Sequence, residues 1–437
     1  MERFLIKELI AWKTSIRRKP LILNGVRQVG KTWLLREFGA QHFDNVVYVN
    51  FDNNPQLTRH FDDGYDIARL ISVLQVETHQ KINPQSTLVI FDEIQECPKA
   101  LTALKYFYEN APEYAVTAAG SLLGLLIHEG TGFPVGKVDT LNLYPLTFRE
   151  FLNAIGEQIL TEAIDSRDYK LIDTFAVKLI NYLRQYYFVG GMPEAVHSFC
   201  QTGDFARSRE IQKQIIYGYE RDMSKHLSVK ETEAVLSAWH SIPAHLSQEN
   251  KRFIFGHIKK SARARDYQSA ITWLTNAGLA LLIPRVSKPA IPLSAYADRS
   301  IFKLFLVDVG LLAAISGLDA HSLIEGNAIF SEFKGALTEQ YVAQELVASI
   351  GVMPFYWSAE NSRGEIDFLV QQNGRIYPIE VKAEENLKAK SLRAFSERYQ
   401  NLLALRFSLS GYREENWMCN IPLYGIFLPS NSSSKQS

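Results

Sequence analysis

Cysteine is scarce in this chain of 437 residues, which contains Cys97, Cys200 and Cys419. These residues lie far apart, and the sequence has no Cys-x-x-Cys motif and no Cys/His cluster with the spacing of a zinc site or a disulfide framework. This usage is typical of a protein in a reducing compartment. We therefore expect a cytoplasmic location.

An excess of charge of one sign is also absent. The chain has 47 basic and 47 acidic residues, so its formal net charge is zero and no global field attracts it to nucleic acid or to an anionic membrane. No apolar run approaches the ~20 residues that a membrane helix needs. Residues 1–19 have charges within an apolar spacing, which predicts an amphipathic helix and not a signal peptide. We expect no membrane partner, and any nucleic-acid binding requires a local basic patch.

A glycine-rich loop stands between a predicted strand at 20–23 and a predicted helix that begins near residue 33. The loop has the complete spacing Gly-x-x-x-x-Gly-Lys-Thr, formed by Gly25, Gly30, Lys31 and Thr32. Backbone amides of such a turn, aimed by a helix N-terminus, form a concave anion site. The alternative is a tight turn that only resembles a phosphate-binding loop, and the flanking strand and helix argue against it.

We expect this loop to bind a nucleoside triphosphate together with Mg²⁺. Lys31 would reach the outer phosphates and the hydroxyl of Thr32 would reach Mg²⁺. A bulkier residue at Gly25 or Gly30 would block the approach of the phosphates to the backbone. The expected nucleotide-binding residues are Gly25, Val26, Arg27, Gln28, Val29, Gly30, Lys31, Thr32, Trp33 and, from a later strand, Ser121.

An acidic pair follows a second predicted strand. Residues 88–91 are continuously apolar, as a strand covered on both faces requires, and Asp92 and Glu93 follow at its carboxyl end. Asp92 is the expected Mg²⁺ ligand and Glu93 the expected group that orients or deprotonates water. The alternative is a pair of solvated acids that cap a strand. A third strand ends at the same edge with Ser121, a plausible contact to the γ-phosphate or to water.

The sequence resembles the AAA-type P-loop ATPases and, more narrowly, a prokaryotic family in which such an ATPase is joined to a winged helix and a C-terminal restriction-endonuclease-like PD-(D/E)XK domain. The resemblance spans nearly the whole chain. Beyond the two phosphate-binding motifs it includes LNLYPLTFREF at 141–151, GGMPEAV at 190–196 and YERDMSK at 219–225. Arg149 in the first of these phrases and Arg221 in the last are candidates for a nucleotide-sensing or trans-acting arginine, although a surface ion pair is the simpler expectation for each.

The resemblance implies an α/β fold that starts with a P-loop parallel-sheet core. A helical lid, a winged helix-turn-helix and a restriction-endonuclease-like α/β domain follow. The expected domains are 1–150 for the ATPase core, 151–234 for the helical lid or linker, 235–320 for the winged helix, 321–429 for the nuclease-like domain and 430–437 for a disordered tail.

The middle of the chain has a basic cluster between two helical patterns. A later pair of extended runs, 279–286 and 300–308, is predicted to form a β-ribbon across a proline-containing tip. Helix, helix and ribbon is the plan of a winged helix-turn-helix, in which basic residues contact the DNA backbone. A solvated charged face is the alternative. The cluster comprises Lys259, Lys260, Arg263 and Arg265.

The stretch 364–383 predicts a hairpin. Two extended runs flank Asn-Gly at 373–374, which favours a two-residue type I′ turn. Such a turn places Gln372 opposite Arg375. Counting outward gives two further pairs, Asp367 with Glu380 and Glu365 with Lys382.

These four charged residues would share one face of the hairpin because side chains alternate between faces. Opposed Cβ atoms lie about 4.5–5.5 Å apart, where the like charges of Asp367 and Glu380 destabilise the pair. Mg²⁺ or Mn²⁺ would offset that repulsion. The alternative is a surface hairpin in which Lys382 bridges Glu365 and one acid has a raised pKa.

The same residues resemble the core of the restriction-endonuclease-type nucleases, in which an acid, an aspartate and Glu-x-Lys follow one another. The resemblance implies Asp367, Glu380 and Lys382 as catalytic residues. It implies Glu339, Asp367 and Glu380 as metal ligands, with Glu339 as the leading acid on a helix.

The leading hypothesis is a Mg²⁺-dependent ATPase whose nucleotide cycle controls a DNA-contacting winged helix and a nuclease-like domain, in DNA processing or in defence. The alternative is a nucleotide switch with slow hydrolysis and an inactive nuclease-like domain that binds a protein or nucleic-acid partner. The sequence leaves a homo-oligomer open.

Overall fold

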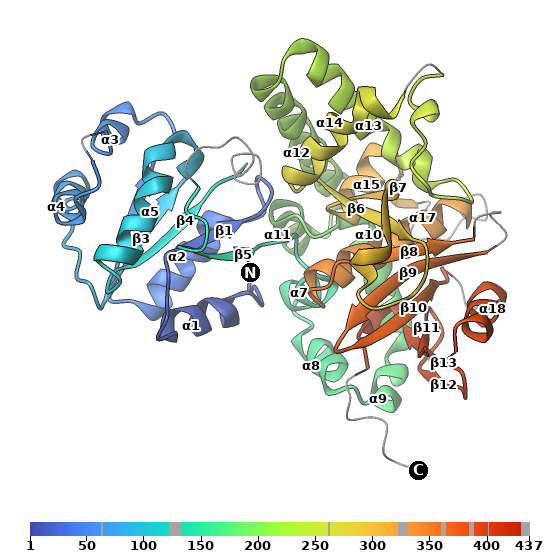
Figure 1. Ribbon diagram of the computed structural model, residues 1–437. Helices are drawn as coiled ribbons and strands as arrows, with labels where there is room; N and C mark the ends of the chain where they lie inside the picture. Colours follow the sequence, from blue (N-terminus) through green and yellow to red (C-terminus); the bar gives the residue numbers. More distant parts are fainter. Residues whose placement is uncertain are drawn as a thin grey trace. The chain divides into compact units, whose positions relative to one another are not determined.

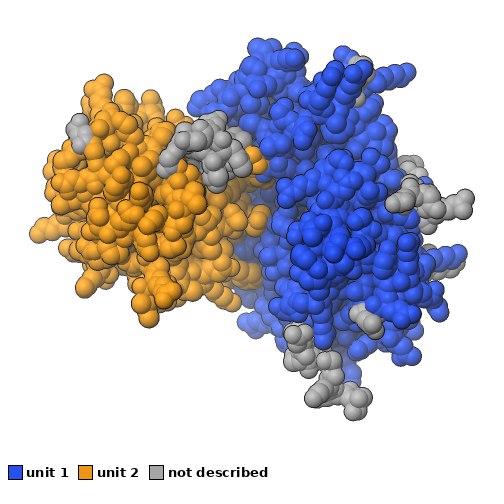
Figure 2. Space-filling model, viewed as in Figure 1, with its two compact units in different colours: residues 1, 145–275, 280–437 blue, residues 2–144, 276–279 orange. Residues whose placement is uncertain are grey.

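The computed structural model describes residues 1–62, 64–121, 133–260, 263–321, 331–359, 364–383, 389–400 and 402–429. The chain forms two compact units (Figure 2). The N-terminal unit contains Glu2–Tyr144 and Asn276–Leu279, and the C-terminal unit contains residue 1, Pro145–Thr275 and Ala280–Ser437. The backbone therefore leaves the C-terminal unit for four residues after Thr275 and then returns. The expected tail at 430–437 lies outside the described residues.

The N-terminal unit is built on a five-stranded sheet with the order β2-β3-β4-β1-β5 (Figure 1). Every neighbouring pair in it is parallel. Parallel strands present their carboxyl ends at one edge, so the loops after β1, β3 and β4 meet there. The strands are β1 (Leu21–Asn24), β2 (Asn45–Asn50), β3 (Thr87–Asp92), β4 (Ala115–Ala119) and β5 (Asp139–Asn142).

Helices cover both faces of this sheet (Figure 1). One face packs its valine, isoleucine and phenylalanine side chains against α3 (Pro55–Arg59), α4 (Ile67–Thr78) and α5 (Pro98–Asn110). The other face packs against α2 (Lys31–His42), where Gly39 permits close approach, because a Cβ there would lie 2.6 Å from Val46 Cγ2. All six residues of β3 are buried, as its apolar run predicts. The expected N-terminal helix is α1 (Ile6–Thr14), which buries Leu9 and Trp12.

The C-terminal unit combines a helical region with an eight-stranded sheet of order β12-β13-β11-β10-β9-β8-β6-β7 (Figure 1). Its strands are β6 (Ala280–Val286), β7 (Ala297–Leu306), β8 (Phe355–Ser358), β9 (Glu365–Gln372), β10 (Arg375–Val381), β11 (Ala404–Ser408), β12 (Arg413–Glu414) and β13 (Met418–Pro422). Its longer helices include α10 (Ala176–Val189), α11 (Pro193–Thr202), α12 (Phe205–His226), α13 (Val229–Leu246), α14 (Ala264–Asn276) and α17 (Ser331–Ala348). Its shorter helices include α7 (Phe148–Ala154), α8 (Gln158–Ser166), α9 (Tyr169–Thr174), α15 (Val309–Ile315) and α18 (Lys390–Arg398).

The predicted fold class is confirmed: the chain is an α/β protein with a parallel P-loop core, a helical region and a C-terminal sheet. The predicted ribbon is also present, because β6 and β7 pair antiparallel from Ala280–Leu306 onward. The ribbon does not stand alone, since β6 also pairs parallel with β8 at Arg285–Tyr356. The ribbon and the later strands therefore form one sheet. The finer division at 234 and 320 stays a prediction.

The phrases at 141–151 and 190–196 meet inside the C-terminal unit. The Leu146 amide donates to the Gly191 carbonyl at 2.7 Å, and the Tyr186 hydroxyl donates to the Leu146 carbonyl. Gln344 of α17 donates to the same tyrosine oxygen at 2.7 Å. These phrases thus join the helical region to α17, which is a structural role that their sequences did not reveal.

Two buried carboxyl groups complete this junction. Glu345 of α17 accepts a hydrogen bond from the Phe148 amide at 2.8 Å, and burial raises its pKa to about 7. Asp308 accepts from the Gly191 amide at 2.6 Å, and burial raises its pKa to about 6. Backbone donors in both cases oppose the effect of burial, which is how an acid is tolerated there.

Within the described residues, no helix is both long and apolar enough to span a membrane.

The close approach at Gly191 gives a stability prediction. A Cβ at this residue would lie 2.1 Å from the Leu146 carbonyl oxygen, so Gly191→Ala should lower the free energy of unfolding by about 1–3 kcal/mol. Gly218→Ala on α12 is the matched control, because its Cβ would meet nothing within 4 Å and alanine favours a helix. Thermal unfolding of both variants measures the difference. Equal midpoints for the two would contradict the close packing.

Candidate nucleotide site

The loop after β1 has the shape that its glycines require. A Cβ at Gly25 would lie 2.4 Å from the Leu143 carbonyl oxygen, so any larger residue would displace the strand next to it. Gly30 has a φ of 94° and immediately precedes α2, whose first residue is Lys31. The amides of the loop and of the first turn of the helix are therefore available to an anion.

Lys31 is buried against its own loop. Its Nζ donates to the carbonyls of Gly25 at 2.8 Å and Val26 at 3.0 Å. Burial lowers its pKa to about 8, and the charges of Glu93 and Asp92 oppose this shift. Carbonyl partners do not neutralise an ammonium, so the site keeps an attraction for a negatively charged ligand.

Asp92 accepts hydrogen bonds from three parts of the N-terminal unit. Its Oδ2 accepts from the Thr32 hydroxyl and from the Tyr48 hydroxyl, both at 2.7 Å. Its Oδ1 accepts from the Glu93 amide at 3.1 Å. The expected meeting of the two motifs is therefore present in the structure.

Tyr48 is a site residue that the sequence analysis missed. It lies on β2, and the Arg36 guanidinium stacks over its ring at 3.8 Å. Burial, together with the hydrogen bond to Asp92, raises its pKa to about 12, so it remains a hydroxyl donor at neutral pH. A tyrosine in a predicted strand is usually interpreted as a core residue. Tyr48 reaches Asp92 because β2 pairs parallel with β3.

Glu93 stands beside this group in a left-handed conformation with φ of 48°. Its Oε2 accepts from Gln95 Nε2 at 2.6 Å, and the Ser121 hydroxyl lies 3.5 Å from the same oxygen. Ser121 is there because β4 lies between β1 and β3 in the sheet. Lys31, Thr32, Asp92, Glu93 and Ser121 are thus brought to one edge.

The remaining predicted loop residues divide by exposure. Val26 and Val29 are buried and pack inward, so only their backbone faces a ligand. Arg27 and Gln28 are exposed, and Trp33 has 44% of its surface exposed. Their side chains take no part in the contacts described above for Asp92 and Glu93.

Family models match several stretches of the chain. Residues 17–152 match a family model described as an AAA domain. Residues 180–322 and 334–424 match two models described as domains of unknown function, DUF8612 and DUF4143. The first match covers both motifs and the whole parallel sheet from β1 to β5. The N-terminal unit is therefore an AAA-type P-loop core.

Two relatives share sequence with this chain. An uncharacterized protein of Mycobacterium tuberculosis, Rv2008c, is 24% identical over 382 residues, which are 85% of this chain and 72% of that protein. An uncharacterized protein of Haemophilus influenzae is 28% identical over 200 residues, which are 44% of this chain and 43% of that protein.

Solved structures with some similarity include the following two. The Walker-type ATPase PABY2304 of Pyrococcus abyssi has a TM-score of 0.45 and 14% identity, over 72% of this chain and 95% of that chain. AMPPCP-bound DnaA from Aquifex aeolicus has a TM-score of 0.27 and 11% identity, over 63% of this chain and 86% of that chain. The assignment of the core depends on the AAA domain match and on the geometry of the loop.

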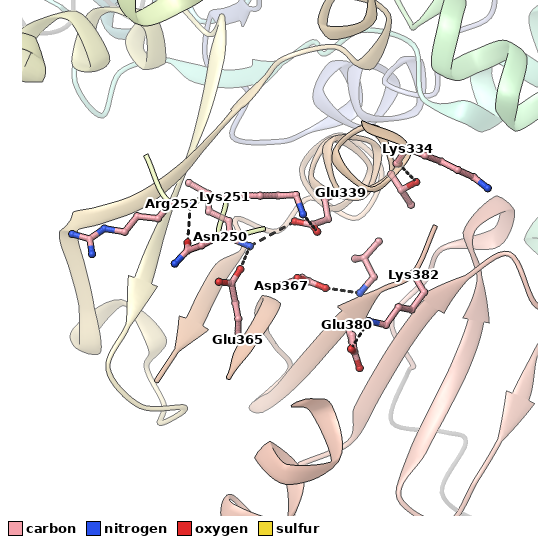
Figure 3. Close-up of polar contacts among 12 residues, drawn as sticks. Asn250, Lys251, Arg252, Lys334, Glu339, Glu365, Asp367, Glu380 and Lys382 are labelled. Atoms are coloured by element: carbon pink, nitrogen blue, oxygen red, sulfur yellow. Dashed lines mark hydrogen bonds and ion pairs between the residues drawn. The ribbon is translucent and has the colours of Figure 1, made fainter. Parts of the chain in front are cut away.

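The predicted hairpin of the C-terminal unit has the expected register. Gln372 pairs with Arg375, and the ladder continues to Phe368 with Ile379. Beyond that pair, the Val381 amide donates to the side chain of Asp367 at 2.7 Å. Glu365, Asp367, Glu380 and Lys382 lie near one another, together with Glu339 of α17 (Figure 3).

Lysine partners in this group differ from the predicted ones. Lys382 lies 2.8 Å from Glu380 Oε1, so the bridge from Lys382 to Glu365 in the alternative is wrong. Glu365 instead pairs with Lys303 of β7, a residue with no exposed surface. Lys303 also lies 3.6 Å from Glu339 Oε2, while Lys251 lies 2.6 Å from Glu339 Oε1.

The electrostatics of this group follow from its burial. Burial would lower the pKa of Lys303, but the charges of Glu365, Glu339 and Asp367 outweigh it and raise the pKa. Burial, together with the charge of Glu339, raises the pKa of Asp367 to about 7. Glu339 has a lowered pKa, because Lys251 and Lys303 overcome the effect of its burial.

The fit of this group to a divalent metal is poor in the folded arrangement. Among the described residues, no group of three or more histidine, cysteine, aspartate or glutamate side chains is placed to hold a metal ion. Ammonium groups instead contact Glu339, Glu365 and Glu380. Lys251 and Lys303 had no signal in the sequence, since they lie 88 and 36 residues before Glu339 and carry no motif.

The predicted basic cluster lies near the N-terminus of α14. Lys259, Lys260, Arg263 and Arg265 are exposed. Arg265 pairs with the adjacent Asp266 at 3.6 Å, an exposed contact of little energetic weight.

The two candidate arginines lie in the C-terminal unit. Arg149 pairs with Asp165 and donates to Ser349 at 2.9 Å, so the simpler expectation of an ion pair describes it. Arg221 is exposed on α12, with its guanidinium 5.9 Å from the Tyr217 ring centroid.

The low pKa of Lys31 predicts a pH dependence of stability. Because folding lowers this pKa from 10.5 to about 8, the folded state binds fewer protons than the unfolded state between those values. Below pH 8 the buried lysine is charged, and its burial lowers the free energy of unfolding by the full amount. This loss disappears as the pH rises towards 10.5. The wild type should therefore gain about 1–3 kcal/mol relative to Lys31→Met between pH 7.5 and 9.5. Urea unfolding of both proteins at the two pH values, without nucleotide, measures this difference, and a constant difference would contradict the shift.

Proposed function

We propose that the N-terminal unit binds and hydrolyses ATP with Mg²⁺. The observation that carries this proposal is the 2.7 Å contact between the Thr32 hydroxyl and Asp92 Oδ2, beside Lys31 and Glu93. A hydroxyl on the phosphate-binding loop and a carboxylate at the end of β3 are the oxygen ligands that a P-loop site offers to Mg²⁺. Bound Mg²⁺ would neutralise charge on the β- and γ-phosphates.

Each side chain has a distinct part in that reaction. Lys31 would leave its carbonyl partners and stabilise the charge that develops on the γ-phosphate. Glu93 would orient the attacking water or accept its proton, with its carboxylate held by Gln95. Ser121 would contact the water or the γ-phosphate, and Tyr48 would keep Asp92 in position.

Two substitutions separate binding from chemistry. Lys31→Ala should abolish hydrolysis, and Glu93→Gln should retain ATP binding while turnover falls about 10²–10⁴-fold. Lys81→Ala is the matched control, because Lys81 is exposed in the same unit and should leave the rate unchanged. Phosphate release and the binding of a fluorescent ATP analogue measure both effects. Undiminished turnover in Lys31→Ala would refute the assignment.

We further propose that the nucleotide cycle controls the C-terminal unit, in which the 235–320 segment acts as a winged helix that contacts DNA. Exposed basic residues before α14 support a contact with the phosphate backbone. A role in DNA processing or defence would follow from such coupling.

The DNA contact has a direct test. Replacing Arg263 and Arg265 with glutamine should weaken DNA binding for all sequences and reduce the slope of log K against log salt by about one unit per lost phosphate contact. Lys230→Gln, at an exposed residue of α13, is the control. Titrations at several salt concentrations measure the slope. An unchanged slope in the double variant would remove the proposed DNA contact.

A second candidate is a nucleotide switch with slow hydrolysis, in which the nuclease-like domain is inactive and binds a partner. The lysine pairing of Glu339, Glu365 and Glu380 favours this candidate for the C-terminal group. ATPase rates with and without DNA distinguish the two, together with an assay for strand cleavage in Mn²⁺. Stimulation by DNA supports the first candidate, and its absence together with absent cleavage supports the switch.

A further inference from the structure

The acidic residues that lie together in the C-terminal unit are paired with lysines of the same unit. Its acids are Glu339, Glu365, Asp367 and Glu380, and its lysines are Lys251, Lys303 and Lys382. The acids come from α17, β9 and β10, and Lys251 comes from a segment earlier in the chain (Figure 3). Lys303 lies on β7, which also precedes these elements. We call these seven residues the carboxylate–lysine cluster.

Two of these lysines differ in how firmly they are held. Lys303 has no exposed side-chain surface and lies between Glu365 and Glu339. Lys251 retains 14% side-chain exposure and reaches Glu339 from the segment between α13 and α14. Lys303 is therefore part of the interior, and Lys251 is the cation at the rim.

The segment that carries Lys251 is fastened to β7. The Phe253 amide donates to the Phe302 carbonyl at 2.8 Å, and the two rings stack with centroids 5.4 Å apart. This attachment places residue 251 beside the strand that carries Lys303. The attachment of this segment to β7 therefore helps to position the Lys251 ammonium at Glu339 Oε1.

The cluster also retains an unused acceptor. Glu380 is 6% exposed, and its Oε2 has no hydrogen-bond partner among the described residues, while Oε1 pairs with Lys382. A buried carboxylate oxygen without a donor is costly in a folded protein. Glu380 Oε2 is therefore an acceptor that the cluster leaves open.

We propose that Lys251 locks the carboxylate–lysine cluster against divalent cations by holding Glu339 Oε1. A carboxylate oxygen binds Mg²⁺ or Mn²⁺ at about 2.0–2.2 Å, so an ammonium in hydrogen-bond contact with that oxygen must leave first. The folded protein then has a closed cluster, and displacement of the segment that carries Lys251 opens it to a divalent cation. This inference goes beyond ATP hydrolysis and does not depend on it.

Removal of the lock is measured as metal binding. Lys251→Met keeps the length of the side chain and removes its charge, so it should bind Mn²⁺ about tenfold or more tightly than the wild type. Lys230→Met, at an exposed lysine of α13, is the matched control and should behave as the wild type. Mn²⁺ titrations without nucleotide, followed by electron paramagnetic resonance of the free ion, give the dissociation constants.

Two further variants assign the new site. Adding Glu339→Gln to Lys251→Met should abolish the gain, because Glu339 is the ligand that the lock covers. Lys251→Arg should retain the weak binding of the wild type, because it keeps a cation at Glu339. Circular dichroism reports folding, and Lys251→Gln replaces the methionine variant if that variant does not fold.

The outcomes separate this inference from the proposed ATPase. Tighter Mn²⁺ binding in Lys251→Met that depends on Glu339 supports the lock. Equal Mn²⁺ affinity in the folded Lys251 variants and the wild type overturns it, as does a gain that survives Glu339→Gln. ATP hydrolysis by Lys251→Met at the wild-type rate shows that the N-terminal site is intact in either case, and its loss in Lys31→Ala tests that site alone.

Discussion

The Asp92 carboxylate is the contact on which the nucleotide site depends. One of its oxygens accepts from Thr32 at the start of α2 and from Tyr48 on β2, and the other accepts from the Glu93 amide. These groups are distant in sequence and meet because β1, β2, β3 and β4 are parallel and end at one edge. A carboxylate shared in this way fixes the position of the loop relative to the acidic pair before any ligand binds, which reduces the reorganisation that binding requires.

Burial acts on lysines in opposite directions in the two units. Lys31 has carbonyl partners, so burial dominates and its pKa falls to about 8. Lys303 has carboxylate partners, so their charges dominate and its pKa rises. The first lysine is therefore held by carbonyl oxygens, whereas the charge of the second is balanced by carboxylates. The same residue type indicates a binding site in one unit and an internal ion pair in the other.

The sequence predicted the parts of the fold that local patterns determine. Gly25, Gly30 and the residues after them identified the loop, and the Asn-Gly dipeptide set the register of β9 and β10 correctly. The sequence analysis did not identify Tyr48, Lys251 or Lys303. Their contacts depend on strand order and on the attachment of one segment to another. Counting residue pairs along the β9–β10 hairpin cannot reveal Lys303, because this lysine lies on β7, an earlier strand of the same sheet.

The β6–β7 ribbon and the later strands of the C-terminal unit share one sheet. A ribbon that only resembled a wing would be free to contact DNA along both of its edges, but β6 uses one edge to pair with β8. The ribbon also delivers Lys303 to the acids of α17 and β9, so its position and the charge balance of the cluster are linked. Because a buried carboxylate that loses its cation is strongly destabilised, any movement of the ribbon or of the segment attached to it must be accompanied by a replacement cation or by proton uptake. A rearrangement of the C-terminal unit that moves these lysines would therefore change the charge balance of the cluster.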